Sequence, residues 1–209
     1  MTNQIGPTSS ALIVLAAGFG RRMREQKLLL VDGQGVPVIR RTVTAACQAA
    51  DALERSQVVL ICNPEFPDVA TVCNDLPVGV QWNPRAGEGM STSLSAGIRW
   101  ADERQFDCAV VILGDQPELR SDMPVELVRT HLNGPDAPIV QARYQGVPGH
   151  PILFSRSLYV ELCAVSGDEG GRSVLHAHRD QCKYVDFSTE PFPDLDTPED
   201  YSAFLRRNS

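Results

Sequence analysis

Short apolar runs alternate with segments of helical periodicity along most of the chain, and this alternation constrains the fold more than any other feature. The apolar runs are rich in β-branched residues, as in "ALIVLA" (11–16), "QVVLIC" (57–62) and "CAVVILG" (108–114). Between them, residues 38–50 and 89–103 carry apolar side chains three or four positions apart. Strands that alternate with helices form a parallel sheet covered on both faces. We therefore predict an α/β fold with three α/β/α layers around a mainly parallel sheet.

The same patterns predict the remaining elements. The helix at 89–103 has Met90, Leu94 and Ile98 on one packed face, and Ser121 is a candidate N-cap for the helix that follows it. No linker or repeat divides the chain, so residues 11–209 are predicted to form a single domain after a disordered polar tail, residues 1–10. Further strands are predicted at 78–82, 137–144 and 150–155, and further helices at 65–73, 121–132, 171–178 and 197–207.

Charge and composition limit the classes of partner. The 209 residues carry a net charge of −7, so no basic field covers the surface and nucleic acid is not an expected partner. No apolar run approaches the roughly 20 residues that span a bilayer, and the first ten residues lack a signal-peptide pattern. We therefore expect a cytoplasmic protein that does not bind membranes. Its six cysteines form no CxxC pair and are expected to be core residues.

The loop after the first strand, "LAAGFGRRMREQK" (15–27), has the residue types that bind phosphate. Its small residues allow backbone amides to approach an anion closely. Four cationic side chains follow within seven residues, which suits the charge of a triphosphate. The small residues are Ala16, Ala17, Gly18 and Gly20, and the cations are Arg21, Arg22, Arg24 and Lys27.

Other interpretations of this loop fit less well. A dinucleotide-binding loop needs a third glycine where Met23 stands, and an acidic residue where the second strand ends at Cys62-Asn63. A Walker loop needs Gly before Lys27 and Ser or Thr after it. A tight turn with solvated arginines is the structural alternative.

Five further motifs follow in order: "GEGMSTSLSAG" (87–97), "LGDQP" (113–117), "GVPGHPILF" (146–154), "GDEGGR" (167–172) and "DLDTPED" (194–200). Together with the first loop they resemble the nucleotidyltransferases of the molybdenum cofactor cytidylyltransferase type, over residues 11–205. The resemblance implies the nucleotide-diphospho-sugar transferase (glycosyltransferase-A-like) fold, which is Rossmann-like. It also implies Mg²⁺-dependent transfer of CMP from CTP to the terminal phosphate of molybdopterin, with release of pyrophosphate. The guanylyltransferase relatives typically have Leu-Ala-Gly-Gly where this chain has Leu-Ala-Ala-Gly.

The resemblance assigns roles to particular residues. Arg22 and Lys27 would neutralise the phosphates, and Asp115 and Asp196 would bind Mg²⁺, which prefers oxygen ligands. The first loop, from Ala16 to Gly20, would bind the nucleotide through its amides. Asn83, Gly89 and Ser91 would contact the nucleotide, and Gly149, His150 and Arg172 would lie on the acceptor side.

Several of these residues have structural alternatives. Asn83 precedes Pro84 in a candidate turn, and "GDEGGR" is also a glycine-rich helix entry. A histidine before a strand, as at His150, is usually a hydrogen-bonded structural residue. Thr197 and Asp200 form a candidate capping box, which leaves Asp196 for the metal.

Two other functions remain open from the sequence. One is an NAD(P)-dependent oxidoreductase of N-heterocycle breakdown, and the other is a non-catalytic module that delivers the cofactor to a molybdenum hydroxylase. For the leading function the expected partners are CTP, molybdopterin and a molybdenum hydroxylase apoenzyme. We expect a monomer or a weak dimer.

Overall fold

The computed structural model describes residues 8–19, 26–134, 137–191, 195 and 197–207. Within these residues seven strands form one sheet in the order β3-β2-β1-β4-β6-β5-β7. The strands are β1 (Ser10–Ala16), β2 (Ser56–Cys62), β3 (Val78–Trp82), β4 (Cys108–Leu113), β5 (Ile139–Tyr144), β6 (Val147–Ser155) and β7 (Cys182–Phe187).

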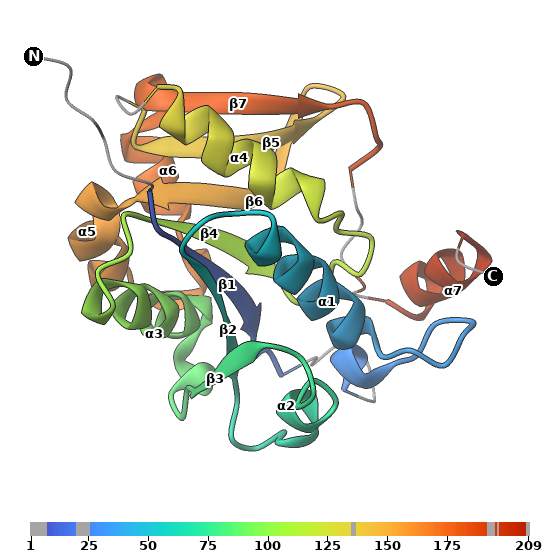
Figure 1. The fold of residues 1–209 in the computed structure, drawn as a ribbon. Helices are drawn as coiled ribbons and strands as arrows, with labels where there is room; N and C mark the ends of the chain where they lie inside the picture. The colour runs from blue at the N-terminus through green and yellow to red at the C-terminus, as the bar shows by residue number, and fades with distance from the viewer. Residues whose placement is uncertain (1–7, 20–25, 135–136, 192–194, 196, 208–209) are drawn as a thin grey trace, which may run out of the picture.

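Helices cover both faces of the sheet, which confirms the predicted three-layer α/β architecture (Figure 1). Each face has its own apolar core, because the central strands alternate their buried side chains between the two sides. On one face lie α1 (Val38–Asp51), α2 (Asp68–Thr71), α4 (Asp122–Leu132) and α7 (Pro198–Arg207). On the other lie α3 (Met90–Glu103), α5 (Tyr159–Ala164) and α6 (Arg172–Ala177).

The strand order places one end of the sheet in position to bind a ligand. From β1 the chain proceeds outward through β2 and β3, and then returns to place β4 on the other side of β1. All of these neighbours are parallel, whereas β6 is antiparallel to both β4 and β5. In open α/β sheets ligands bind outside the carboxyl ends of the strands where the order reverses. The residues that follow β1 and β4 therefore mark the candidate site.

Several predicted boundaries were wrong. The helix predicted at 65–73 is reduced to the four residues of α2, and neither α5 nor β7 was predicted. Strand β6 begins at Val147, because a two-residue turn at Gln145 and Gly146, both with positive φ, connects it to β5. Ser121 precedes α4, but its hydroxyl makes no capping hydrogen bond.

The first described residues pack against the core. Strand β1 begins at Ser10, and Ser9 is also buried. The Ser9 hydroxyl donates a hydrogen bond to Asp107 Oδ2 at 2.8 Å. The last two residues of the segment predicted as a tail are therefore ordered by contacts with the end of the α3–β4 connection.

The structure confirms that the cysteines are core residues at four of six positions. Cys47, Cys62, Cys73 and Cys108 are buried, and all six thiols are free. Burial raises the pKa of Cys62 to about 12, so that thiol stays protonated near neutral pH. None of the helices in the described part of the chain is long and apolar enough to cross a bilayer.

Candidate active site

Lys27 and Asp115 meet at the carboxyl ends of β1 and β4, although 88 residues separate them. The Lys27 Nζ atom lies 2.6 Å from Asp115 Oδ2. Lys27 opens the 3-10 turn η1 (Lys27–Leu29), and Asp115 follows β4 by two residues. The side chains are only 14% and 17% exposed, so solvent screens their attraction less than at the protein surface. The structure thus brings together two residues that were predicted to act on phosphate and metal.

The backbone before Asp115 is held firmly by its neighbours. Gly114 N donates to Leu15 O at 2.9 Å, and the buried Thr42 hydroxyl of α1 donates to Gly114 O at 3.1 Å. A Cβ at Gly114 would lie 2.8 Å from Leu15 O and 2.9 Å from the Ile39 side chain. Only glycine allows β1, α1 and the turn after β4 to approach this closely. The motif glycine therefore serves to place the Asp115 carboxylate.

His150 and Arg172 belong to the same region as Asp115. The β4–β6 pairing ends at Val111 and Ile152, so His150 lies on β6 beyond the end of that ladder. Burial lowers the pKa of His150 to about 4, while the charge of Asp115 raises it and that of Arg172 lowers it. His150 is therefore neutral near pH 7. Gly149, also predicted on the acceptor side, lies against the Tyr144 ring and accepts a hydrogen bond from Gln141 through its carbonyl.

The first glycine loop follows β1, at the edge of the sheet where Lys27 and Asp115 meet. Ala16 and Ala17 are 3% exposed, while a Cβ on Gly18 would meet nothing among the described residues within 4 Å. The Phe19 ring packs edge-on against Phe66 at 5.8 Å and also lies beside Gly87. The loop therefore contacts the connection after β3. Four predicted loop residues lie outside the described residues: Gly20, Arg21, Arg22 and Arg24.

The connection after β3 carries the second group of predicted residues, and there Asn83 has a structural role. It is buried, and its Nδ2 donates to the hydroxyls of Thr92 and Ser93, both at 2.9 Å. Its Oδ1 accepts from Arg85 N at 3.0 Å, which closes an Asx turn. This geometry favours the turn interpretation, because both amide hydrogens are used within the protein.

The motifs around Gly89 and Gly167 pack directly on one another. Gly89 has φ +117°, and a Cβ on it would lie 2.5 Å from Gly167 O. A Cβ on Gly170 would lie 3.0 Å from the Met90 sulfur. The "GDEGGR" segment is thus a glycine-rich entry to the six-residue helix α6. Met90 is 46% exposed, so the prediction that it begins the packed stripe of Leu94 and Ile98 was wrong. It precedes the part of α3 that covers the sheet.

Ser91 lies at the start of α3 with an unsatisfied hydroxyl. It is 1% exposed, and its Oγ has no hydrogen-bond partner among the described residues. An orphaned buried hydroxyl is costly, so such a group often marks a place where a ligand or water completes the site. Ser91 also lines an open groove of about 410 Å³ that runs along α3 between β3 and the segment after α5.

Asn63 was missed by the sequence analysis. It follows β2 directly, at the same edge of the sheet as Ala17 and Asn83. Its Oδ1 accepts from Glu65 N at 2.9 Å, but its buried Nδ2 has no partner within the described part of the chain. A polar amide immediately after a buried strand was the available signal.

The predicted metal ligands lie only partly within the described residues. Asp196 and Asp194 lie outside the described residues, and elsewhere no group of three His, Cys, Asp or Glu side chains could hold an ion. Mg²⁺ commonly takes one or two carboxylates and completes its shell with phosphates and water. Asp115, a partly exposed carboxylate at the sheet edge, fits that requirement.

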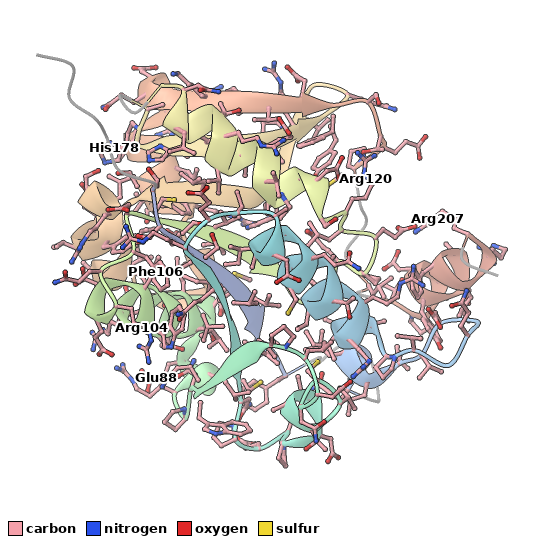
Figure 2. All side chains as sticks on the ribbon, viewed as in Figure 1. Glu88, Arg104, Phe106, Arg120, His178 and Arg207 are labelled. Carbon is pink, nitrogen blue, oxygen red and sulfur yellow. The ribbon has the colours of Figure 1, made fainter. Side chains whose placement is uncertain are left out.

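The segment that contains Asp196 leads into α7. The predicted capping box at its start is confirmed: Thr197 Oγ1 donates to Asp200 Oδ2 at 2.7 Å, and Asp200 N donates to Thr197 Oγ1 at 3.2 Å. Arg207 of α7, labelled in Figure 2, pairs with Glu118 at 2.8 Å and so ties the helix to the segment after β4.

Known proteins of similar length resemble this chain. Purine catabolism protein PucB of Bacillus subtilis is 26% identical, over 94% of this chain and 96% of that protein. The molybdenum cofactor cytidylyltransferase of Escherichia coli is 24% identical, over 93% and 95%. The crystal structure of Rv0371c from Mycobacterium tuberculosis is 27% identical with a TM-score of 0.80, covering 96% of this chain and all of that one. Its complex with manganese is 26% identical with a TM-score of 0.72, covering 95% and 99%.

The family model for the MobA-like NTP transferase domain matches residues 12–182. These residues include the first loop, Lys27, Asp115 and the edge of the sheet on which they meet. This match favours the nucleotidyltransferase interpretation of the first loop over the dinucleotide-binding one. The chain belongs to the family of MobA-like NTP transferase domains and is a nucleotidyltransferase.

Proposed function

We propose that the protein transfers CMP from CTP to the terminal phosphate of molybdopterin and releases pyrophosphate. The observation that carries this proposal is the contact between Lys27 and Asp115 where the strand order reverses. It combines a cation for a triphosphate with a carboxylate for a divalent ion at the mouth of a phosphate-binding loop. The Escherichia coli relative, named as a molybdenum cofactor cytidylyltransferase, supports the choice of acceptor.

The reaction requires two anions to meet, so its main demand is charge neutralisation with in-line positioning. The acceptor phosphate attacks the α-phosphorus, and the bond to the bridging oxygen of pyrophosphate breaks. Lys27 would neutralise the triphosphate, assisted by the amides of Ala17 and Gly18 and by Arg22. Bound to Asp115 and Asp196, Mg²⁺ would supply Lewis-acid polarisation of the α-phosphate. The manganese complex of the Mycobacterium tuberculosis protein supports a divalent ion in this family.

The preference for cytosine is proposed to arise beside β1 and β2. Ala17 stands where the guanine-specific relatives have glycine, and its methyl group would narrow the space for a purine. Asn63 Nδ2, which has no partner among the described residues, can donate to a carbonyl oxygen of the base, and the Ser91 hydroxyl can donate or accept. Ala17 and Asn63 follow β1 and β2 at the same edge of the sheet, and Ser91 lies in the first turn of α3.

The acceptor is proposed to enter from the β6 side. There His150 is neutral near pH 7, so it can act as a hydrogen-bond donor or acceptor without adding charge. The exposed Arg172 guanidinium can bind the acceptor phosphate, a geometry that suits arginine.

Pyrophosphate release tests this function directly. Purified protein with molybdopterin and Mg²⁺ is expected to release pyrophosphate from CTP faster than from GTP or ATP. Asp115→Asn should reduce turnover by at least about 10²-fold, as expected for loss of one electrostatic stabiliser. Equal turnover of CTP and GTP would contradict the choice of base. No release from any triphosphate would contradict the transfer itself.

A further inference from the structure

The Lys27–Asp115 contact has a consequence for the order in which nucleotide and metal bind. The ammonium group lies 2.6 Å from the same carboxylate that is proposed to bind the divalent ion. Both side chains are largely shielded from solvent, so the contact is stronger than an exposed ion pair. The inference that follows rests on the proposed function, in which Asp115 is a metal ligand.

An ammonium group and a divalent cation do not share one carboxylate oxygen easily. A metal at a bonding distance of about 2.1 Å from Oδ2 would lie within a few ångströms of Nζ, where two positive charges repel strongly. Two groups of the described part of the chain, His150 and Arg172, belong to this region, and neither offsets the repulsion. His150 is neutral near pH 7, and Arg172 adds a further positive charge to the same region. Free divalent ions therefore meet a carboxylate whose charge is already compensated.

A triphosphate changes this balance because it offers Lys27 another anionic partner. The lysine ammonium sits on a flexible four-carbon stem and can move from one oxygen to another without rearrangement of the backbone. The first loop lies close to Lys27, because Gln26, its neighbour in the chain, donates from Nε2 to Gly18 O at 3.5 Å. Once Lys27 moves to the phosphates, Asp115 Oδ2 becomes available, and the nucleotide itself contributes additional oxygen ligands.

We propose that Lys27 excludes divalent cations from Asp115 until a nucleoside triphosphate binds, so that the metal enters the site only with the nucleotide. Lys27 thus has two roles at different stages. It is the counter-ion of the metal-binding carboxylate before the nucleotide arrives, and it is the partner of the phosphates afterwards.

The test measures binding of Mn²⁺ alone, without nucleotide or acceptor, from the electron paramagnetic resonance signal of the free ion. Lys27→Met is expected to bind Mn²⁺ at least about tenfold more tightly than the unmodified protein, which corresponds to release of one moderately strong ion pair. The double variant Lys27→Met with Asp115→Asn should lose this gain. Thermal unfolding of each variant verifies that the fold is intact.

Arg172→Met is the matched control, since it removes one positive charge from the same region and leaves the Lys27–Asp115 contact in place. Its Mn²⁺ affinity should rise much less than that of Lys27→Met, because it is Lys27 that lies against Asp115 Oδ2. An unchanged affinity in Lys27→Met, an equal gain in Arg172→Met, or a gain that survives in the double variant would each overturn the inference. Calorimetry with CTP in the presence of Mg²⁺ tests the proposed function separately: absence of nucleotide binding would refute that function, whatever the Mn²⁺ series shows.

Discussion

His150 offers a quantitative test of the environment at the acceptor side of the site. Burial on β6 lowers its pKa from 6.5 to about 4, with smaller and opposing effects of Asp115 and Arg172. The unfolded chain therefore binds a proton at this histidine at a higher pH than the folded protein does. Stability from this group is complete above the unfolded pKa and is lost as the pH falls through 6.5 towards 4.

The size of the effect follows from the pKa difference. Each unit of pKa corresponds to about 1.4 kcal/mol, so acidification from about pH 7.5 to about pH 5 should cost about 2 kcal/mol through His150 alone. His150→Gln keeps hydrogen-bonding capacity but does not titrate. The free energy of unfolding of this variant should therefore fall about 2 kcal/mol less than that of the unmodified protein over the same range.

Urea unfolding followed by far-ultraviolet circular dichroism at the two pH values measures this difference. His176→Gln is the matched control, because His176 is an exposed histidine on α6. It should leave the pH dependence of stability unchanged. If His150→Gln and the unmodified protein lost the same stability on acidification, the argument that burial keeps His150 neutral would be refuted.

Three further predictions test the packing around the site. Gly89→Ala should lower the free energy of unfolding in urea by more than about 2 kcal/mol, because its Cβ would clash with Gly167 O. The control Gly146→Ala, where φ is positive but the space is open, should lower it by only about 1 kcal/mol. Thr42→Val should cost about 1–3 kcal/mol by leaving Gly114 O without its hydroxyl donor, and Thr42→Ser should restore most of the loss; equal losses would contradict that role. Cys62, whose pKa burial raises to about 12, should react with a thiol reagent only on unfolding, and rapid labelling of the native protein would contradict its burial.

The sequence was sufficient for the architecture of the sheet and most of its elements. Strands β1, β2 and β4 are buried on both faces of the sheet. A strand buried on both faces must be apolar at nearly every position, and such a continuous run is easily recognised in the sequence. Strand β7 escaped prediction because it is an edge strand whose side chains are only partly buried, which weakens its pattern. Helix α5 is six residues long and exposes 82% of Val160, so its periodicity is also weak.

The candidate site required the tertiary structure, because its geometry depends on residues far apart in the chain. The sequence by itself indicated that Lys27 and Asp115 would act on phosphate and metal. Only the tertiary structure, in which β1 and β4 are neighbours, shows that the two side chains contact each other. Whether Asn83 or Asn63 has an amide available for a ligand was equally undetermined, since both asparagines follow strands. In the folded protein the Asn83 Nδ2 donates to two hydroxyls of α3, whereas the Asn63 Nδ2 has no partner within the described residues. Local patterns identify which residues have suitable chemistry, whereas long-range contacts determine which of their atoms remain available.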